Sequence, residues 1–373
     1  MNYLFVLGRN PKLSIAEVLS CFKQKINYSL ISDNLLLIKN LPSQPNIEKF
    51  GGILAIGKTL FSCDKNEIPE KIKNIYFEEK TKFSYSVINL TDFNIEGLLK
   101  EKFKEEKLKS VYKPLRGRIK GQDNKIYIGT PTYFKKRDIT YFLVKKEKYY
   151  FGCLNQIYNS EEAERRDIEK PFRREELAIS PRLAKILINL SGVNENEILL
   201  DPFCGVGIIL QEALLQDINI IGIDKNKDAL EKARKNIEWL KKNYQFKAEY
   251  KLISGDSRKI KIEKVDAIVT EPFLGKLLKK IPREDEAERI INDFENLIIQ
   301  VLTNLNNFLE KKGKIVFTSP FIKTRNGRKG CKIKKILELT GLKIKEIDNI
   351  TFPIQEFRTK QIVGREIFVL EKP

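Results

Sequence analysis

Short apolar runs alternate with amphipathic helical patterns through the second half of the chain. Strands are predicted at residues 198–200, 219–223, 252–255, 265–269 and 314–318. Apolar residues recur at helical spacing in 183–190, 230–240 and 284–310. Two more apolar runs, 351–353 and 362–370, are expected to close the sheet as an edge hairpin. Strands that alternate with helices favour an α/β fold with a mostly parallel sheet.

Polar residues stand where these strands end. Asp201 follows the first strand and is followed by Gly205 and Gly207, and a helical pattern begins at residue 208. Asp224 ends the second strand, about 20 positions after the glycines, a spacing that suits a hydrogen bond to ribose hydroxyls. Glycine lets the backbone approach a ligand, and a helix start offers free N–H groups. The pattern predicts a ligand site at the carboxyl edge of the sheet, although many glycine-rich turns only connect a strand to a helix.

The two later strands end in the same way. Asp256 and Ser257 follow the strand at 252–255, and residues 270–273, Thr-Glu-Pro-Phe, follow the strand at 265–269. Polar side chains follow four successive strands, and a functional site explains this pattern better than four turns that only connect a strand to the next element.

The first half of the chain has shorter elements and no obvious chemistry. We expect an accessory α/β domain at 1–70, an RNA-binding domain at 71–155, a polar linker at 156–180 and the main α/β domain at 181–373. Ser180 and Pro181 suit the N-cap and the first turn of the helix that opens the last of these.

Composition narrows the possible chemistry. The chain has no histidine, which excludes a histidine base, a Ser-His-Asp triad and a histidine-ligated metal. Its five cysteines form no Cys-x-x-Cys pair, so no zinc site or other metal site and no disulfide framework is expected. No apolar run approaches 18 residues and the start lacks a basic leader, so we expect no membrane span and a cytoplasmic location.

The net charge points to a polyanionic partner. Lys and Arg number 69 against 50 Asp and Glu, a net charge of +19. Residues 100–148 hold sixteen basic and six acidic residues, about half of that excess. Basic side chains near glycines and Tyr112 suit phosphate contact and base stacking. The alternative is a lysine-rich surface that is only solvated. The candidate RNA-binding residues are Lys113, Arg116, Arg118, Lys120, Lys135, Lys136 and Arg137.

Three motifs together resemble a known family. Asp-Pro-Phe-Cys-Gly-Val-Gly at 201–207, Gly-Ile-Asp at 222–224 and Thr-Glu-Pro-Phe at 270–273 look like the S-adenosylmethionine site and catalytic loop of class I amino-methyltransferases. The segments 166–173 and 180–190 are similar to the linker of the THUMP-containing tRNA guanine N2-methyltransferases. The resemblance covers residues 140–275 well and fades before residue 130, where a THUMP region is inferred mainly by position.

This resemblance implies a Rossmann-like, seven-stranded methyltransferase sheet, S-adenosylmethionine as cofactor and tRNA as partner. It implies methyl transfer to guanine N2, usually at tRNA position 10. The expected cofactor-binding residues are Asp201, Phe203, Gly205, Gly207, Asp224, Asp256 and Ser257. The expected catalytic residues are Thr270, Glu271, Pro272 and Phe273.

One departure from the family pattern leaves alternatives open. Related catalytic loops begin with Asp or Asn followed by two prolines, whereas this loop begins with Thr270 and Glu271. Either side chain is a candidate acceptor for the target amine, with backbone carbonyls contributing. In the inactive alternative, Glu271 pairs with a lysine such as Lys276. The rival functions are an amino-methyltransferase for ribosomal RNA or DNA, and a non-catalytic RNA-binding protein that keeps the cofactor fold. A nicotinamide dehydrogenase is weaker, because the glycines do not form G-x-G-x-x-G.

Overall fold

The computed structural model describes the chain except residues 23, 77–81, 116–117, 121–124, 129–130 and 174–178. Contacts divide the chain into two compact units. The first comprises Met1–Ile15, Gln24–Glu48 and Gly52–Ser160, and the second comprises Ala16–Lys23, Lys49–Gly51 and Glu161–Pro373. The finer division into 1–70, 71–155, 156–180 and 181–373 stays a prediction.

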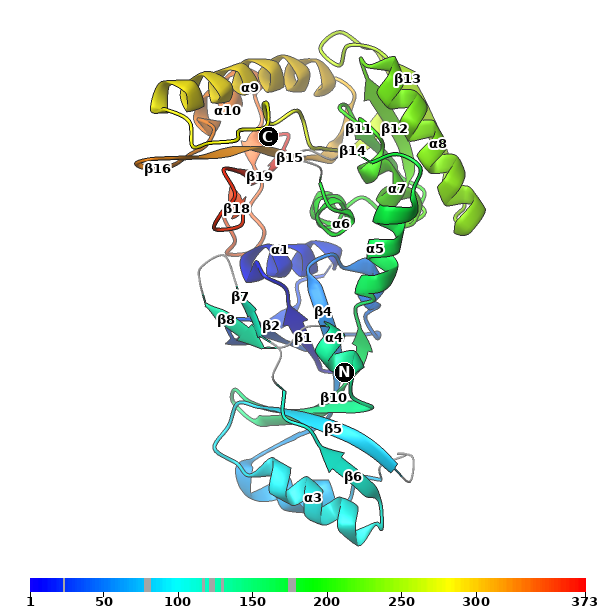
Figure 1. Ribbon diagram of the computed structural model, residues 1–373, viewed down its shortest axis with the longest axis vertical. Coiled ribbons are helices and arrows are strands. Elements are labelled where there is room, and N and C mark those ends of the chain that lie inside the picture. Colours follow the sequence, from blue (N-terminus) through cyan, green and yellow to red (C-terminus); the bar gives the residue numbers. More distant parts are fainter. Residues whose placement is uncertain (23, 77–81, 116–117, 121–124, 129–130, 174–178) are drawn as a thin grey trace. The chain divides into compact units, whose positions relative to one another are not determined.

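The first unit is built on one eight-stranded sheet with the order β2-β3-β1-β4-β10-β9-β5-β6 (Figure 1). Its pairs are antiparallel except that β5 runs parallel to both β6 and β9. Helix α3 packs its buried residues Ile95, Leu99 and Phe103 into an aromatic core with Phe83 and Tyr85. The elements are β1 (Tyr3–Leu7), α1 (Pro11–Cys21, shared with the second unit), β2 (Asn27–Ser32), β3 (Leu35–Lys39), η1 (Ile47–Lys49, shared with the second unit), β4 (Ile53–Cys63), η2 (Lys65–Glu67), α2 (Ile68–Lys73), β5 (Lys82–Asn89), α3 (Ile95–Glu105), β6 (Lys109–Tyr112), β7 (Arg118–Lys120), β8 (Ile126–Ile128), α4 (Pro131–Lys135), β9 (Ile139–Lys145) and β10 (Tyr149–Ile157).

The second unit holds the expected α/β sheet. Its main path has the order β13-β12-β11-β14-β15-β19-β17, and the short strands β16 and β18 pair beside it. The strands from β13 to β15 are parallel, and β19 is antiparallel to β15. The elements are α5 (Ser160–Glu169), α6 (Pro181–Ser191), β11 (Ile198–Asp201), α7 (Ile208–Leu214), β12 (Asn219–Asp224), α8 (Lys227–Asn243), β13 (Tyr250–Ser254), β14 (Val265–Thr270), α9 (Glu284–Leu305), β15 (Leu309–Thr324), β16 (Gly327–Lys329), α10 (Ile333–Thr340), β17 (Lys343–Ile344), β18 (Ile354–Glu356) and β19 (Val363–Glu371).

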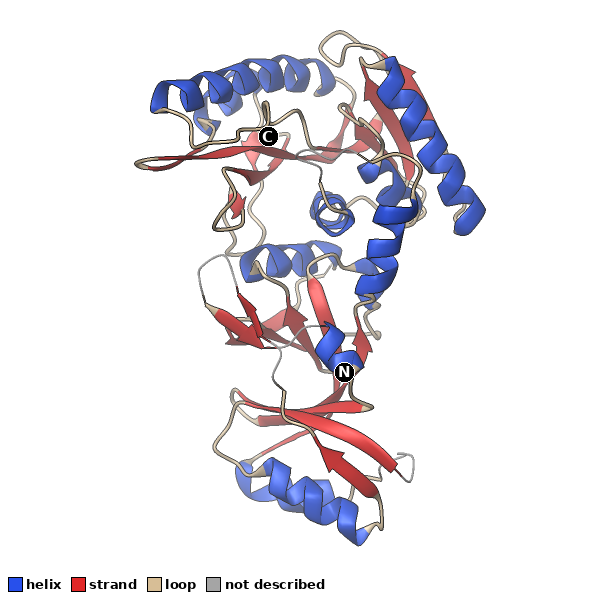
Figure 2. Cartoon of the chain, in the orientation of Figure 1, coloured by secondary structure: helices blue, strands red, loops and turns tan. Residues whose placement is uncertain are grey.

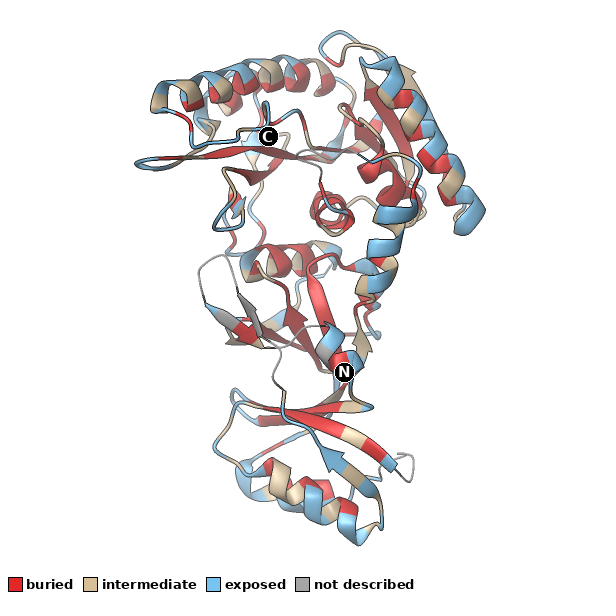
Figure 3. Cartoon of the chain, viewed as in Figure 1, coloured by how far each residue is buried: buried red, intermediate tan, exposed pale blue. Residues whose placement is uncertain are grey.

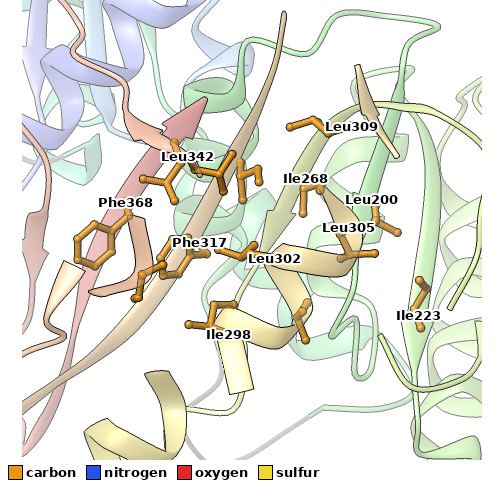
Figure 4. Close-up of a cluster of buried hydrophobic side chains, with 14 of the residues drawn as sticks. Leu200, Ile223, Ile268, Ile298, Leu302, Leu305, Leu309, Phe317, Leu342 and Phe368 are labelled. Carbon is orange, nitrogen blue, oxygen red and sulfur yellow. The ribbon is translucent and has the colours of Figure 1, made fainter. Parts of the chain in front are cut away.

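Helices cover both faces of this sheet. Helices α6, α7 and α8 contact one another in turn, and α9 packs with α10 across the sheet from them (Figure 2). Apolar residues of α9, among them Ile298, Leu302 and Leu305, pack against Ile268 and Phe317 of the strands (Figure 4). The inner parallel strands β12, β11, β14 and β15 are therefore mostly buried, whereas the edge strand β13 is not. The carboxyl ends of the parallel strands carry the polar residues.

The helix expected after Ser180 is present as α6. The Ser180 hydroxyl accepts a hydrogen bond from the backbone N–H of Leu183 at 3.2 Å, and Pro181 stands in the first turn. Gly192 ends the helix with a φ of 70°. Almost the whole of α6 is buried (Figure 3).

The edge hairpin expected from 351–353 and 362–370 is present, but its first strand lies slightly later in the chain: β18 pairs antiparallel with β19. β19 has β15 on one side, and on its other side the edge is formed by β18 and by the two-residue strand β17, which the pattern did not predict. Most residues of β19 are apolar, and all but Glu371 are buried. The long helix also ends at Leu305 instead of residue 310, because Leu309 already pairs with Val265 as the start of β15.

Candidate active site

A cavity of about 570 Å³ lies at the carboxyl edge of the second unit's sheet. The loops that follow β11, β12, β13 and β14 line it, together with the start of α8 and one residue of α9. This is the edge at which open α/β sheets bind their ligands. Its lining residues are Pro202, Phe203, Gly205, Val206, Asp224, Lys225, Asn226, Asp228, Ala229, Lys232, Gly255, Asp256, Ser257, Arg258, Glu271, Phe273 and Leu297.

The glycine loop after β11 is held by the acidic residue that ends β12. Gly205 has a φ of 52°, and its backbone N–H donates to Oδ2 of Asp224 at 3.0 Å. The other oxygen of Asp224 accepts from the N–H of Asn226 at 2.9 Å. Gly207, with a φ of 84°, caps α7. Asp224 thus fixes the loop while it faces the cavity, and a Cβ built on Gly205 would meet open space.

Asp201 and Thr270 form a buried pair behind the cavity wall. The Thr270 hydroxyl donates to Oδ1 of Asp201 at 2.7 Å, and the N–H of Phe203 donates to the same oxygen at 3.1 Å. Burial raises the pKa of Asp201 to about 7, although both hydrogen bonds act in the opposite direction. The pair joins the ends of the neighbouring strands β11 and β14 and is not part of the cavity lining.

Glu271 lies on the cavity wall and is paired with a residue that the sequence did not single out. Nε of Arg365 donates to Oε2 of Glu271 at 2.5 Å, and Nη2 donates to Oε1 at 2.9 Å. The Thr318 hydroxyl donates to Oε2 at 3.3 Å. Burial disfavours the charge on Arg365, but the facing carboxylate outweighs it and raises the pKa of Arg365. The partner of Glu271 is therefore Arg365 and not Lys276.

The next two residues of the same loop differ in exposure. Pro272 is buried, whereas the side chain of Phe273 is 52% exposed and lines the cavity. An exposed aromatic ring at the mouth of a polar cavity is suited to stacking on a flat ligand.

Asp256 and Ser257 reach the same cavity from the loop after β13. The Arg258 guanidinium holds the carboxylate of Asp256 in a bidentate pair and lowers its pKa to about 2. The Ser257 hydroxyl donates to the carbonyl of Pro202 at 2.6 Å, which joins this loop to the glycine loop.

Several of the predicted RNA-binding residues cluster in the first unit. The Ser86 hydroxyl donates to the carbonyl of Lys113 and accepts from Nε of Arg137 at 3.1 Å. Lys135 and Lys136 lie just before Arg137 and are exposed. Arg116 lies outside the described residues, and so do the side chains of Arg118 and Lys120 on β7.

Sequence reasoning missed Arg365 and Leu297 at the site. Both come from elements that are far from the motifs in the chain, β19 and α9. Arg365 stands in a mostly apolar strand, and a cation in such a run was the signal that could have revealed a buried acidic partner. No local pattern marked Leu297.

Comparison with known proteins agrees with this geometry. Residues 171–318 match the model of the RMKL-like methyltransferase domain, and residues 56–235 match a model of DNA methylases. A tRNA (guanine(10)-N2)-dimethyltransferase of Pyrococcus abyssi is 26% identical over 326 residues, which cover 86% of this chain and 89% of that protein. The chain is thus similar to methyltransferases, and over most of its length to a tRNA guanine N2-methyltransferase.

A further relative matches over a shorter stretch, and a solved structure matches in fold. The enzyme of the same printed name from Methanothermobacter thermautotrophicus is 33% identical over 144 residues, 38% of this chain and 39% of that protein. The crystal structure of TrmN from Thermus thermophilus shares the fold, with a TM-score of 0.53, 13% identity and complete coverage of both chains. In the described part of the chain, no helix is long and apolar enough to cross a membrane.

Proposed function

We propose that this chain transfers a methyl group from S-adenosylmethionine to the exocyclic N2 amine of a guanine in tRNA. The observation that carries the proposal is one continuous cavity wall that includes Gly205, Asp224, Glu271 and Phe273. A cofactor loop and a base-binding loop then face the same space. The relatives are named for guanine 10, and we propose the same nucleotide here.

The wall beside the glycine loop suits the cofactor. Asp224 would hold the ribose hydroxyls, the backbone of Gly205 would face the amino-acid portion, and Asp256 would face the adenine amine. Phe203, Val206 and Leu297 supply apolar contact. When bound, the cofactor supplies a methyl group already activated by a positively charged sulfur. The buried Asp201 and the capping Gly207 would support the loop from behind rather than touch the cofactor.

The geometry favours Glu271 over Thr270 as the side chain that accepts a hydrogen bond from the target amine. The Thr270 hydroxyl is fully buried and donates to Asp201, so it points away from the cavity. Two donors occupy Oε2 of Glu271 and one occupies Oε1, and a carboxylate oxygen accepts about two hydrogen bonds. Oε1 therefore keeps one position for the target amine. That bond would orient the nitrogen lone pair toward the methyl group. The N–C bond would form as the S–C bond of the sulfonium breaks and leaves a neutral thioether, and the proton lost by the amine would pass to Oε1 of Glu271.

Phe273 and the first unit would hold the RNA. The exposed Phe273 ring would stack on a guanine turned out of its helix, which brings N2 to Glu271. Lys113, Lys135, Lys136 and Arg137 would contact phosphates of the tRNA body. Shape and backbone contacts of this kind suit a structured RNA.

The test is transfer of labelled methyl groups from S-adenosylmethionine to unmodified tRNA, followed by nucleoside digestion. We expect the label in N2-methylguanosine or the dimethyl form, and less label in ribosomal RNA or duplex DNA assayed side by side. Glu271→Gln should lower kcat more than Thr270→Ala, whereas the exposed Lys311→Gln should leave it unchanged. The proposal fails if Glu271→Gln and Thr270→Ala both transfer methyl groups like the wild type.

A further inference from the structure

The segment that follows Phe273 is an anchored loop with exposed lysines. Leu274 and Pro282 are buried at its two ends, and Leu278 packs against the core in the middle. Between these anchors, Lys276, Lys279 and Lys280 are exposed. Buried anchors at three points fix the path of the backbone, so the exposed side chains are presented from a defined position.

Apolar side chains are exposed in the same stretch. Phe273, Leu277 and Ile281 are 52%, 45% and 44% exposed, one at every fourth residue. The first of them lines the cavity. A surface that mixes exposed apolar groups with cations, and that is continuous with a site, is typical of an interaction surface rather than of plain solvated protein.

The positive charge of this loop is not cancelled by the acidic start of α9. Lys329 pairs with Glu284 at 2.8 Å, and Arg283 pairs with Asp285 at 3.2 Å. Glu284 and Asp285 are thus engaged with other cations. Within the part of the chain that the structure describes, the ammonium groups of Lys276, Lys279 and Lys280 take part in no ion pair. Three cations remain available for a ligand.

We propose that residues 276–281, here called the docking loop, bind the RNA strand next to the nucleotide that enters the cavity. The lysines contact its phosphates, and Leu277 and Ile281 contact the sugars and bases beside the one held by Phe273. The inference rests on the proposed function, and it deepens it, because it places a second RNA contact on the catalytic unit itself. The lysines make the surface complementary in charge to a polyanion. RNA is favoured over an acidic protein because unstacked bases also offer apolar faces to Leu277 and Ile281.

The test removes the three charges and keeps polar, flexible side chains of similar size. The variant Lys276→Gln/Lys279→Gln/Lys280→Gln is compared with Lys242→Gln/Lys311→Gln/Lys312→Gln. These three control lysines are exposed and lie at the end of α8 and the start of β15, at the opposite edge of the sheet. The dissociation constant of unmodified tRNA is measured across a salt series, and that of S-adenosylmethionine by calorimetry.

We expect the docking-loop variant to bind tRNA about 10- to 100-fold more weakly at about 150 mM salt. The slope of log Kd against log salt should fall by about 2 to 3, since each lost phosphate contact removes about 0.7 to 0.9. Cofactor affinity should stay at the wild-type value, which shows that the variant is folded. The arginine variant Lys276→Arg/Lys279→Arg/Lys280→Arg should keep tRNA binding. Leu277→Ser/Ile281→Ser should weaken binding with little change in the slope.

Two results would overturn the docking loop: tRNA binding by the glutamine variant that equals the wild type, or an equal loss in the control variant, which would reflect net charge alone. The proposed function fails separately. If the wild type forms no N2-methylguanosine, the assigned reaction is wrong. If the docking-loop variant still loses tRNA affinity and the control variant does not, the proposal that the loop binds RNA is nevertheless supported.

Discussion

Arg365 binds both carboxylate oxygens of Glu271, although 94 positions separate the two residues in the chain. The N–O distances are 2.5 and 2.9 Å, and both side chains are about nine-tenths buried. A strand that is separated from β14 by β15 therefore fixes the side chain that we propose to face the target amine. The fork of the guanidinium sets the plane of the carboxylate, which a single lysine could not do.

Replacing one member of this pair should destabilise the fold more than replacing both members. Glu271→Gln leaves the buried guanidinium of Arg365 without its counter-charge, so the free energy of unfolding should fall by about 3 to 5 kcal/mol. The double variant Glu271→Gln/Arg365→Met should recover part of that loss. Urea unfolding of the wild type, both single variants and the double variant measures the coupling. Strictly additive single effects would contradict a direct pair.

The buried Asp201 should make stability depend on pH. The pKa of Asp201 is about 7 in the folded protein, against an ordinary value of 3.8. Between pH 3.8 and about pH 7 the folded protein therefore holds a proton that the unfolded chain has lost. The contribution of Asp201 to stability should be greatest below about pH 4, decline as the pH rises to about 7, and stay constant above that. The full decline is about 4 kcal/mol, at 1.36 kcal/mol per pKa unit.

The variant Asp201→Asn keeps an acceptor for Thr270 and removes this titration. Its stability relative to the wild type should be higher at pH 8 than at pH 5, read from thermal unfolding at both values. Parallel pH profiles for the two proteins would show that Asp201 titrates normally.

Phe273 should act through stacking on the target base. Phe273→Ala should lower kcat/KM for tRNA about 10- to 100-fold, because stacking of one base contributes about 1 to 3 kcal/mol. Phe273→Tyr keeps the ring and should retain most of the activity. The affinity for S-adenosylmethionine should not change in either variant. Equal activity of the alanine and tyrosine variants would exclude the stacking role.

Asp224 should affect cofactor binding through two contacts. Asp224→Ala removes the expected ribose contact and also the acceptor for the Gly205 N–H. We expect the dissociation constant of S-adenosylmethionine to rise at least about tenfold, the equivalent of 1.4 kcal/mol. Asp228→Asn provides the control, since Asp228 lines the same cavity but pairs with Lys232 at 2.6 Å. Calorimetry should therefore separate the two aspartates.

The sequence predicted the architecture of the second unit well because its signals are local. Apolar runs, the glycines after Asp201 and the Ser180-Pro181 start each act within a few residues, and the parallel strands then bring their ends together. The sequence pattern also predicted that Glu271 and Phe273 share one edge of the sheet with Asp224, and in the structure all three line the same cavity.

What the sequence did not predict depends on long-range packing. The place of β19 between β15 and β17 follows from sheet order, which an apolar run does not encode. Arg365 could not be matched to Glu271 for the same reason. The opposite orientations of Thr270 and Glu271 follow from the alternation of successive side chains at the end of a strand, which a motif read as a string does not include.

The pairing between Glu271 and Arg365 has a consequence for synthesis of the protein on the ribosome. The glycine loop, Asp224 and the catalytic loop all emerge well before β19, so a growing chain can form the cofactor wall early. The Glu271 carboxylate gains its partner only when β19 has emerged and has inserted beside β15. A nascent chain could therefore hold the parts of the proposed cofactor site before the proposed acceptor side is assembled, and we expect competence to modify RNA only after β19 has joined the sheet.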